Sequence, residues 1–137
     1  MPHDGLRVPV LMVPLDEAEV TNGVLRIAGP VGVTFPPRLP FESTRQVAMA
    51  IENPHPQVGS TAVRIAIAGP DDAVLPESVR DHTVRWRPGT PPGGPVFNYI
   101  IDDVPVTFSA QGAYTVQVFI NDDPIPRAVT SFGVFLQ

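Results

Sequence analysis

The chain has 137 residues, which fits a single domain, and it contains no cysteine, which excludes disulfides, thiolate metal sites and cysteine nucleophiles. Its 14 acidic and nine basic residues give a net charge of −5, and no basic patch suited to nucleic acid occurs along the sequence. No signal peptide and no apolar run of membrane-spanning length is seen, so we predict a cytoplasmic protein without a membrane partner. We expect a polar arm over residues 1–7 and one domain over residues 8–137.

The 18 prolines limit the secondary structure that this chain can form. Proline lacks a backbone N–H group and disfavours the helical conformation in the residue before it. Because the prolines are spread along the chain, almost no window of about ten residues can form an uninterrupted helix. Their distribution therefore predicts short strands joined by rigid, Pro-rich loops.

The first two predicted strands form a hairpin. They cover residues 8–20 and 24–28, and Thr21, Asn22 and Gly23 separate them. An Asn-Gly pair readily adopts the positive φ angles of a tight turn, so these strands should pair in an antiparallel way.

Longer strands are predicted over residues 44–53, 61–68 and 114–120, because apolar side chains occupy every second position in each. Successive side chains of a strand point to opposite faces, so one face of each strand should line a core. The expected core residues are Val47, Met49, Ile51, Val63, Ile65, Ile67, Tyr114, Val116, Val118 and Ile120.

The remaining segments are less regular. A short helix is expected over residues 76–81, with Pro76 as its first residue. Residues 96–109 return to strand character, with a bulge expected near Asp102, Asp103 and Pro105. A turn over residues 121–124 precedes a last strand over residues 129–136, which brings the count to seven or eight.

The spacing Gly112-Ala113-Tyr114 at the start of a strand is typical of a tyrosine corner, in which the phenol bonds back to the backbone where the chain crosses between sheets. Together with the strand count it predicts an all-β fold, an Ig-like β-sandwich of mainly antiparallel strands. An immunoglobulin domain proper also needs a cysteine pair, which this chain lacks.

Aspartate pairs at 71–72, 102–103 and 122–123 could supply oxygen ligands to Ca²⁺, as in sandwiches of the C2 type. Aspartate in a turn also bonds its own backbone, and this explains the pairs without a metal. His3, His55 and His82 are scattered, so no zinc site is predicted. We expect no metal and no cofactor, and a calcium-binding C2-like module is kept as an alternative.

No nucleophile elbow and no phosphate-binding glycine loop occurs in the sequence, so no catalytic residues are assigned and the chain is predicted not to be an enzyme. Arg85, Trp86 and Arg87 form the local feature most suited to a ligand, because an indole beside guanidinium groups can stack on a sugar or a base. The competing interpretation places Trp86 at one end of the core with both arginines pointing outward.

The last predicted strand is apolar on both faces, with Phe132, Val134 and Leu136 on one and Phe135 on the other. Such a strand at the edge of a sheet favours association, because unpaired edges attract further strands. We therefore expect these four residues to form an interface with a protein partner or with a second copy of the chain.

The sequence resembles an uncharacterised bacterial β-sandwich family, a domain of unknown function. The similarity rests on the acidic, small-residue segment at 15–20, the hairpin and strand at 22–29, and the strand at 112–122. This resemblance implies no catalytic residues.

The predicted function is that of a non-catalytic structural or adaptor subunit acting through protein contacts, in a bacterial or phage assembly. A small-ligand-binding sandwich for a sugar or nucleotide is the alternative from another class.

Overall fold

The computed structural model describes residues 13–21, 24–30, 33–53, 59–87 and 96–137. These ranges contain strands and a single 3₁₀ turn, and none of their helical residues forms a segment long and apolar enough to cross a membrane. The prediction of an all-β fold is therefore confirmed. The elements are β1 (Val13–Thr21), β2 (Val24–Pro30), β3 (Val33–Thr34), β4 (Phe41–Asn53), β5 (Gly59–Ala68), the turn η1 (Pro76–Ser78), β6 (Arg80–Trp86), β7 (Val96–Phe108), β8 (Gly112–Ile120) and β9 (Ala128–Val134).

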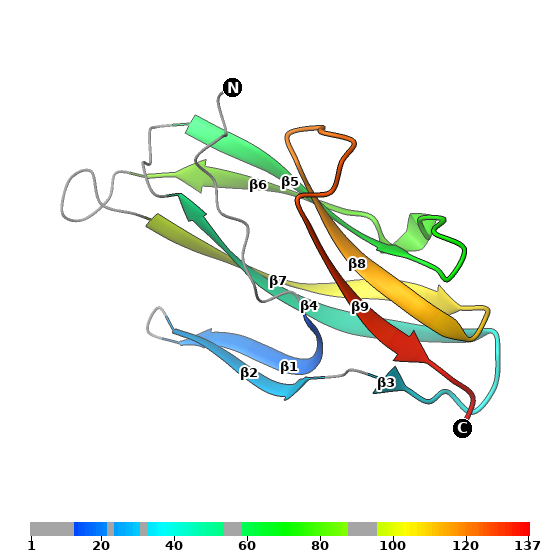
Figure 1. The fold of residues 1–137 in the computed structure, drawn as a ribbon. Helices are drawn as coiled ribbons and strands as arrows, with labels where there is room; N and C mark the ends of the chain where they lie inside the picture. The colour runs from blue at the N-terminus through cyan, green and yellow to red at the C-terminus, as the bar shows by residue number, and fades with distance from the viewer. Residues whose placement is uncertain (1–12, 22–23, 31–32, 54–58, 88–95) are drawn as a thin grey trace.

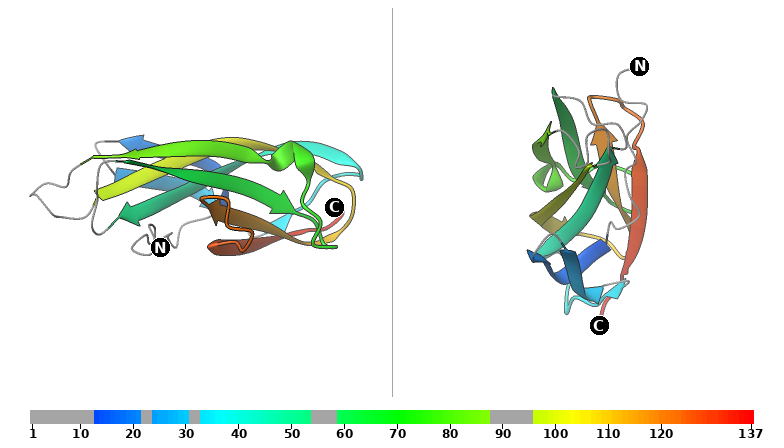
Figure 2. Two further views of the ribbon diagram at one scale, coloured as in Figure 1. Left: turned by 90° about the horizontal axis from the view of Figure 1, so that it is seen from above. Right: turned by 90° about the vertical axis from the view of Figure 1, so that its left-hand side faces the viewer.

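The strands form two sheets (Figure 1). Sheet A has the order β2-β1-β4-β7, and sheet B has the order β3-β9-β8-β5-β6. Neighbouring strands are antiparallel throughout, except that β3 runs parallel to β9. The molecule is elongated along its strands (Figure 2), and the chain passes repeatedly from one sheet to the other.

The predicted hairpin is present, since β1 and β2 pair in an antiparallel way from Leu15 opposite Pro30 to Thr21 opposite Val24. The Asn-Gly turn between them lies outside the described residues, as does the predicted arm over residues 1–7.

The bulge predicted in β7 is wrong. β4 and β7 pair in one continuous register, from Phe41 opposite Phe108 to Asn53 opposite Val96. Pro105 lies within this ladder, opposite Thr44. It is tolerated there because β7 is an edge strand, and an edge strand has one side on which no ladder bond is needed.

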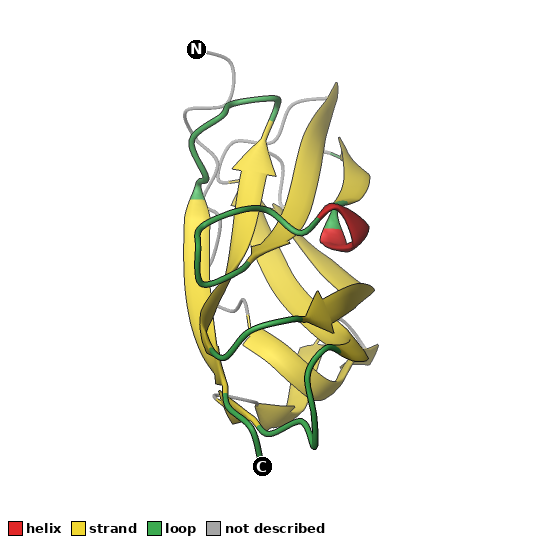
Figure 3. Ribbon diagram, turned by 90° about the vertical axis from the view of Figure 1, so that its right-hand side faces the viewer, coloured by secondary structure: helices red, strands yellow, loops and turns green. Residues whose placement is uncertain are grey.

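The predicted short helix begins at Pro76 but ends as a single 3₁₀ turn at Ser78 (Figure 3). The Ile67 amide donates to Ser78 Oγ over 2.8 Å, and that hydroxyl donates to the Leu75 carbonyl over 2.7 Å. These bonds hold the turn against β5, and β6 starts two residues later at Arg80. A longer helix has no room between these contacts and β6.

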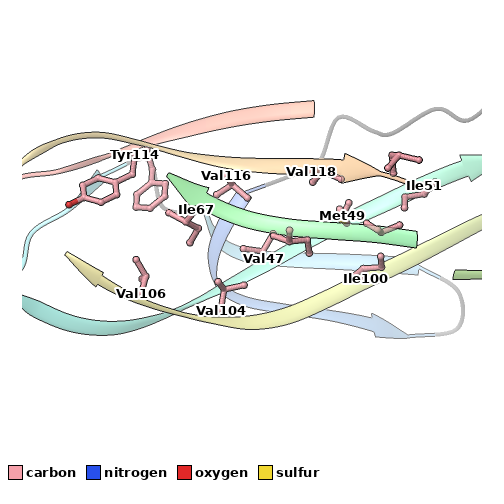
Figure 4. Packing of buried hydrophobic residues seen from close by; sticks show 14 of the residues in the cluster. Val47, Met49, Ile51, Ile67, Ile100, Val104, Val106, Tyr114, Val116 and Val118 are labelled. Atoms are coloured by element: carbon pink, nitrogen blue, oxygen red, sulfur yellow. The ribbon is translucent and has the colours of Figure 1, made fainter. Parts of the chain in front are cut away.

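The two sheets pack face to face around one core (Figure 4). All ten core residues predicted from alternation are buried, with at most 2% of each residue's surface exposed, so that prediction is confirmed. Burial of this apolar surface is the main stabilising contribution in a fold of this kind. At one end of the core the rings of Phe108, Tyr114 and Phe132 pack together, with centroids 5.1 to 6.0 Å apart.

The predicted tyrosine corner is present. Tyr114 lies just after the start of β8, and its hydroxyl donates to the carbonyl of Ala110 over 2.7 Å. Ala110 belongs to the short connection between β7 in sheet A and β8 in sheet B. The phenol therefore ties the crossover between the sheets to the core.

Candidate ligand-binding site

A hollow of about 500 Å³ lies on the outer face of sheet B, over β6, β5 and β8 and beside the turn after β8. We call it the sheet B hollow. Small side chains on β5 make the floor of the hollow. Ala62 and Ala66 carry only a methyl group, and they lie two residues before and two residues after Arg64 on the same face of the strand. Val74 and Val79 form its apolar side toward η1.

Three side chains lie in one row across the sheet B hollow. Arg64 of β5 is directly opposite Asp81 of β6 on one side and Phe119 of β8 on the other. Arg64 Nε donates to Asp81 Oδ1 over 2.7 Å, and Arg64 Nη2 donates to Asp81 Oδ2 over 3.3 Å. This two-point geometry fixes the plane of both charged groups.

The hydrogen bonds between Arg64 and Asp81 favour the charged form of both groups. The hydrogen bond from Arg64 lowers the pKa of Asp81 below its ordinary value, and the same bond raises the pKa of Arg64. About half of the Arg64 side chain and 65% of the Asp81 side chain remain exposed to solvent. The carboxylate of Asp122 faces this pair and raises the pKa of Arg64 further.

The turn after β8 forms the rim of the sheet B hollow. Asn121 and Asp122 have φ angles of 49° and 62°, the left-handed conformation that short polar residues tolerate. The amide of Ala62 donates to Asn121 Oδ1, and the Asn121 amide donates to the Ala62 carbonyl, each over 2.9 Å. The rim is thereby fastened to β5, and it carries Asp122 and Asp123 into the hollow.

The explanation of the aspartate pairs by turns holds for two of the three. Asp71 Oδ1 accepts from the amide of Ala73 over 3.1 Å, and Asp123 Oδ1 accepts from the amide of Ile125 over 3.0 Å. Each is a side chain bonding the backbone two residues on, as expected in turns. Asp102 and Asp103 instead lie within β7, so the turn explanation is wrong for that pair.

Asp102 lies on the inner face of β7, where the edges of the two sheets meet. Its Oδ2 is 2.6 Å from His82 Nε2, and Arg80 donates to both of its oxygens over 3.2 Å. Only 11% of the Asp102 side chain is exposed. Burial alone would raise the pKa of Asp102, but the hydrogen bonds from Arg80 and His82 lower it below its ordinary value.

This cluster was missed from the sequence, although a signal for it was present. Asp102 occupies the same face of β7 as Ile100 and Val104, and His82 occupies the same face of β6 as Val84. A charged group at a core-facing position needs an oppositely charged partner, because an isolated buried charge is costly. Alternation in the two strands therefore called for a pair between them.

The predicted ligand-binding residues do not form a site together. Trp86 is buried, with 8% exposed, and its Nε1 donates to Thr61 Oγ1 over 2.8 Å. Arg85 and Arg87 are exposed on either side of it. The indole lies in the core because Trp86 shares the inner face of β6 with Val84, so it offers no surface for stacking.

The four predicted interface residues separate into two groups. Phe132 and Val134 are core residues, with 3% and 0% exposed, which corrects their assignment to an interface. They are buried because β9 pairs with β8 and turns this face toward sheet A. Phe135 and Leu136 follow the strand and are 45% and 44% exposed.

Within the described ranges no three His, Asp or Glu side chains gather closely enough to hold a metal ion. His82 is engaged by Asp102, while His3 and His55 fall outside the described residues.

No family model matches the chain, and neither does any curated protein. Among solved structures, the chain is similar to an alkylpurine DNA glycosylase of Pseudomonas fluorescens bound to DNA containing an abasic site analogue. The match has 12% identity and a TM-score of 0.41, and it covers 75% of this chain but 27% of the glycosylase.

This finding corrects two expectations from the sequence. The chain was expected not to be an enzyme, and its partner was expected to be protein rather than nucleic acid; the similar structure is an enzyme bound to DNA, so neither expectation is kept. With a TM-score of 0.41, the likeness assigns neither glycosylase activity nor DNA binding to this chain.

Proposed function

We propose that the chain is an Ig-like β-sandwich that binds a small polar ligand in the sheet B hollow. The observation that carries the proposal is the exposed Arg64–Asp81 pair, held in a fixed plane in the lining of a hollow of about 500 Å³. Ligand sites usually combine an apolar lining with a small number of precisely placed polar groups. Ala62, Phe119 and Val74 supply the former here, and the pair supplies the latter.

The Ig-like part of the proposal is supported by topology. β8 carries a tyrosine corner at its start, in the position that strand F occupies in Ig-like domains. β5, β8 and β9 are then neighbours in one sheet, like strands C, F and G, while β4 and β7 pair in the other, like strands B and E.

The Arg64–Asp81 pair is better explained by binding than by stability. An ion pair this exposed contributes little to folding, because water screens both charges. Its substitution should therefore leave the fold intact and remove the polar centre of the hollow, which separates the two roles.

The other predicted functions have less support in these contacts. Two of the four residues predicted to form an interface for a structural or adaptor role are buried in the core. The C2-like alternative would need a cluster of acidic side chains, and no three of them gather in the described ranges. The sugar or nucleotide alternative is retained, but at the sheet B hollow instead of at Trp86.

The test is amide NMR of the ¹⁵N-labelled chain titrated with a library of small polar fragments. We expect shifts concentrated at residues 62–66, 81–83 and 119–123, and we expect them to vanish in the Arg64→Ala, Asp81→Ala double variant while its dispersed spectrum is kept. Arg85→Ala is the matched control, since Arg85 is an exposed arginine of β6 outside the hollow. Shifts that cluster elsewhere, or that survive in the double variant, would refute the proposal.

A further inference from the structure

We infer that the ligand of the sheet B hollow is a neutral, hydroxyl-rich molecule, a saccharide in chemical class, and that Arg64 and Asp81 recognise a pair of adjacent hydroxyl groups. The inference rests on the proposed function and names the ligand for the same site. It depends on three properties of the hollow: its charge, its remaining hydrogen-bonding positions and its floor.

The charge of the hollow disfavours anions. Arg64 is the single arginine among the described lining residues, and it is already paired with Asp81, while His82 is engaged by Asp102. Asp122 and Asp123 add two further negative charges at the rim. A phosphate or carboxylate would therefore meet a surplus of negative charge, in a chain whose net charge is −5. This argues against a nucleotide.

The distribution of charge in the hollow also disfavours a small cation. Arg64 lines the hollow, where it would repel an ammonium group, and no three acidic side chains converge on one point in the described residues. A neutral ligand avoids both penalties.

The pair keeps donors and acceptors side by side. The bonds to Asp81 use Arg64 Nε and Nη2, which leaves N–H groups of Nη1 for a ligand. Each carboxylate oxygen of Asp81 accepts one bond from Arg64 and retains a further lone pair. A hydroxyl group both donates and accepts, so two adjacent hydroxyls match an exposed donor next to an exposed acceptor.

The floor suits the other surface of a sugar ring. Phe119 lies next to Arg64 in the same row, and the methyl groups of Ala62 and Ala66 lie on either side of Arg64 along β5. Pyranose rings combine equatorial hydroxyls with faces made of C–H groups, which pack on apolar and aromatic side chains. A row that passes from carboxylate to guanidinium to phenyl ring complements such a molecule.

The experiment titrates the ¹⁵N-labelled chain separately with neutral hexasaccharides of glucose, xylose, mannose and N-acetylglucosamine, and with AMP and spermidine. We expect at least one neutral hexasaccharide to shift the amides of residues 62–66, 81–83 and 119–123, while AMP and spermidine do not. Phe119→Ala and Arg64→Ala should each weaken that binding roughly tenfold, the effect of losing about 1.4 kcal/mol of contact. Arg85→Ala should leave the affinity unchanged.

The outcomes separate the inference from the proposed function. Shifts at the hollow with AMP or spermidine, and with none of the sugars, would overturn the saccharide class while the site stands. An absence of shifts at the hollow with every probe would overturn the class, and with a negative fragment titration it would overturn the proposed function too. Sugar binding that Arg64→Ala leaves unchanged would refute the assigned recognition.

Discussion

The Asp102 carboxylate keeps its charge inside the protein because two partners compensate for its burial. Arg80 reaches both oxygens, and His82 contacts one of them over 2.6 Å. The folded pKa of Asp102 therefore lies below the value of about 3.9 found in unfolded chains. Such a group adds stability above the unfolded pKa and loses that contribution as the pH falls through the folded pKa.

Asp102→Asn should thus act differently at neutral and acidic pH. At pH 7 we expect it to lower the free energy of unfolding by roughly 2 kcal/mol, the scale of hydrogen bonds to a charged group. Below about pH 4 the wild type loses the same contribution by protonation, so the two stabilities should converge. Urea unfolding from pH 7 to pH 2 measures both curves.

Asp103→Asn is the control for this prediction. Asp103 neighbours Asp102 but is exposed, and its carboxylate accepts a hydrogen bond from Gln46 Nε2 over 3.3 Å. Its replacement should shift the stability by a few tenths of a kcal/mol at most at any pH. An Asp102→Asn variant whose deficit stays constant down to pH 2 would contradict the electrostatic explanation.

Single residues differ in how far the sequence predicts them. Alternation alone placed Ile65 and Val116 in the core, because a strand has only two faces and apolar side chains choose the dry one. The turn explanation failed for Asp102, because a carboxylate on the core-facing side of a strand was taken for a turn residue. The sequence did not reveal the partners of Asp102, because they lie in a strand about twenty residues away and only the packing of the sheets brings them near.

At the scale of elements, the tyrosine corner secures the connection from β7 to β8. The connection is short, and the Tyr114 hydroxyl donates to Ala110 within it while the ring packs against Phe108 and Phe132. One side chain therefore joins the loop, the last residue of β7 and the core.

Tyr114→Phe should keep the ring contacts and remove this bond. The Ala110 carbonyl would lose its partner in a partly buried place, and we expect a loss of about 1 to 3 kcal/mol in the free energy of unfolding. Tyr99→Phe is the matched control, because the Tyr99 hydroxyl has no hydrogen-bond partner within the part of the chain that the structure describes. Equal effects of the two changes in urea unfolding would show that the corner contributes nothing specific.

The elements that the sequence predicts best are those whose formation depends on residues close together along the chain. Alternation predicted β4 and β5, and turn residues predicted the hairpins β1–β2 and β8–β9. The bulge in β7 was wrong because Pro105 is disruptive only inside a sheet, and the sequence does not say which strand is the edge. The sequence did not predict β3 as a separate strand, because a strand of two residues that pairs in parallel with β9 is too short to show a periodic pattern.

At the scale of the whole molecule, the two sheets are joined by directional contacts on both sides of the core. Arg80 and His82 of sheet B reach Asp102 of sheet A at one side. Arg45 of sheet A donates to Thr34 Oγ1 of β3 over 3.1 Å at the other, and its guanidinium lies 5.5 Å from the centre of the Phe108 ring. Apolar packing between the sheets is therefore bordered by polar contacts at each edge.

The candidate site depends on the arrangement of strands in the whole molecule, and the sequence could not have predicted it. Asp81, Arg64 and Phe119 form one row only because β5 lies between β6 and β8 in that register. The alanines that make the hollow were visible on one face of β5, but alanine there is equally consistent with an exposed, featureless surface. The order of strands decides between these, and it depends on pairings between residues far apart along the chain.

The cluster around Asp102 also bears on how uniquely the two sheets align. Valine and isoleucine faces can slide past one another with small changes in contact, whereas a carboxylate held by hydrogen bonds from both Arg80 and His82 allows a single offset. Replacing all three residues, as in the Arg80→Leu, His82→Leu, Asp102→Leu variant, should cost little stability, because only the Asp102 side chain is largely buried and a charge withdrawn from water is often no better than apolar packing. We expect its amide and methyl NMR signals to be broadened or doubled around β6 and β7, where the wild type gives single sharp ones. A triple variant with equally sharp signals would show that apolar packing alone selects the alignment.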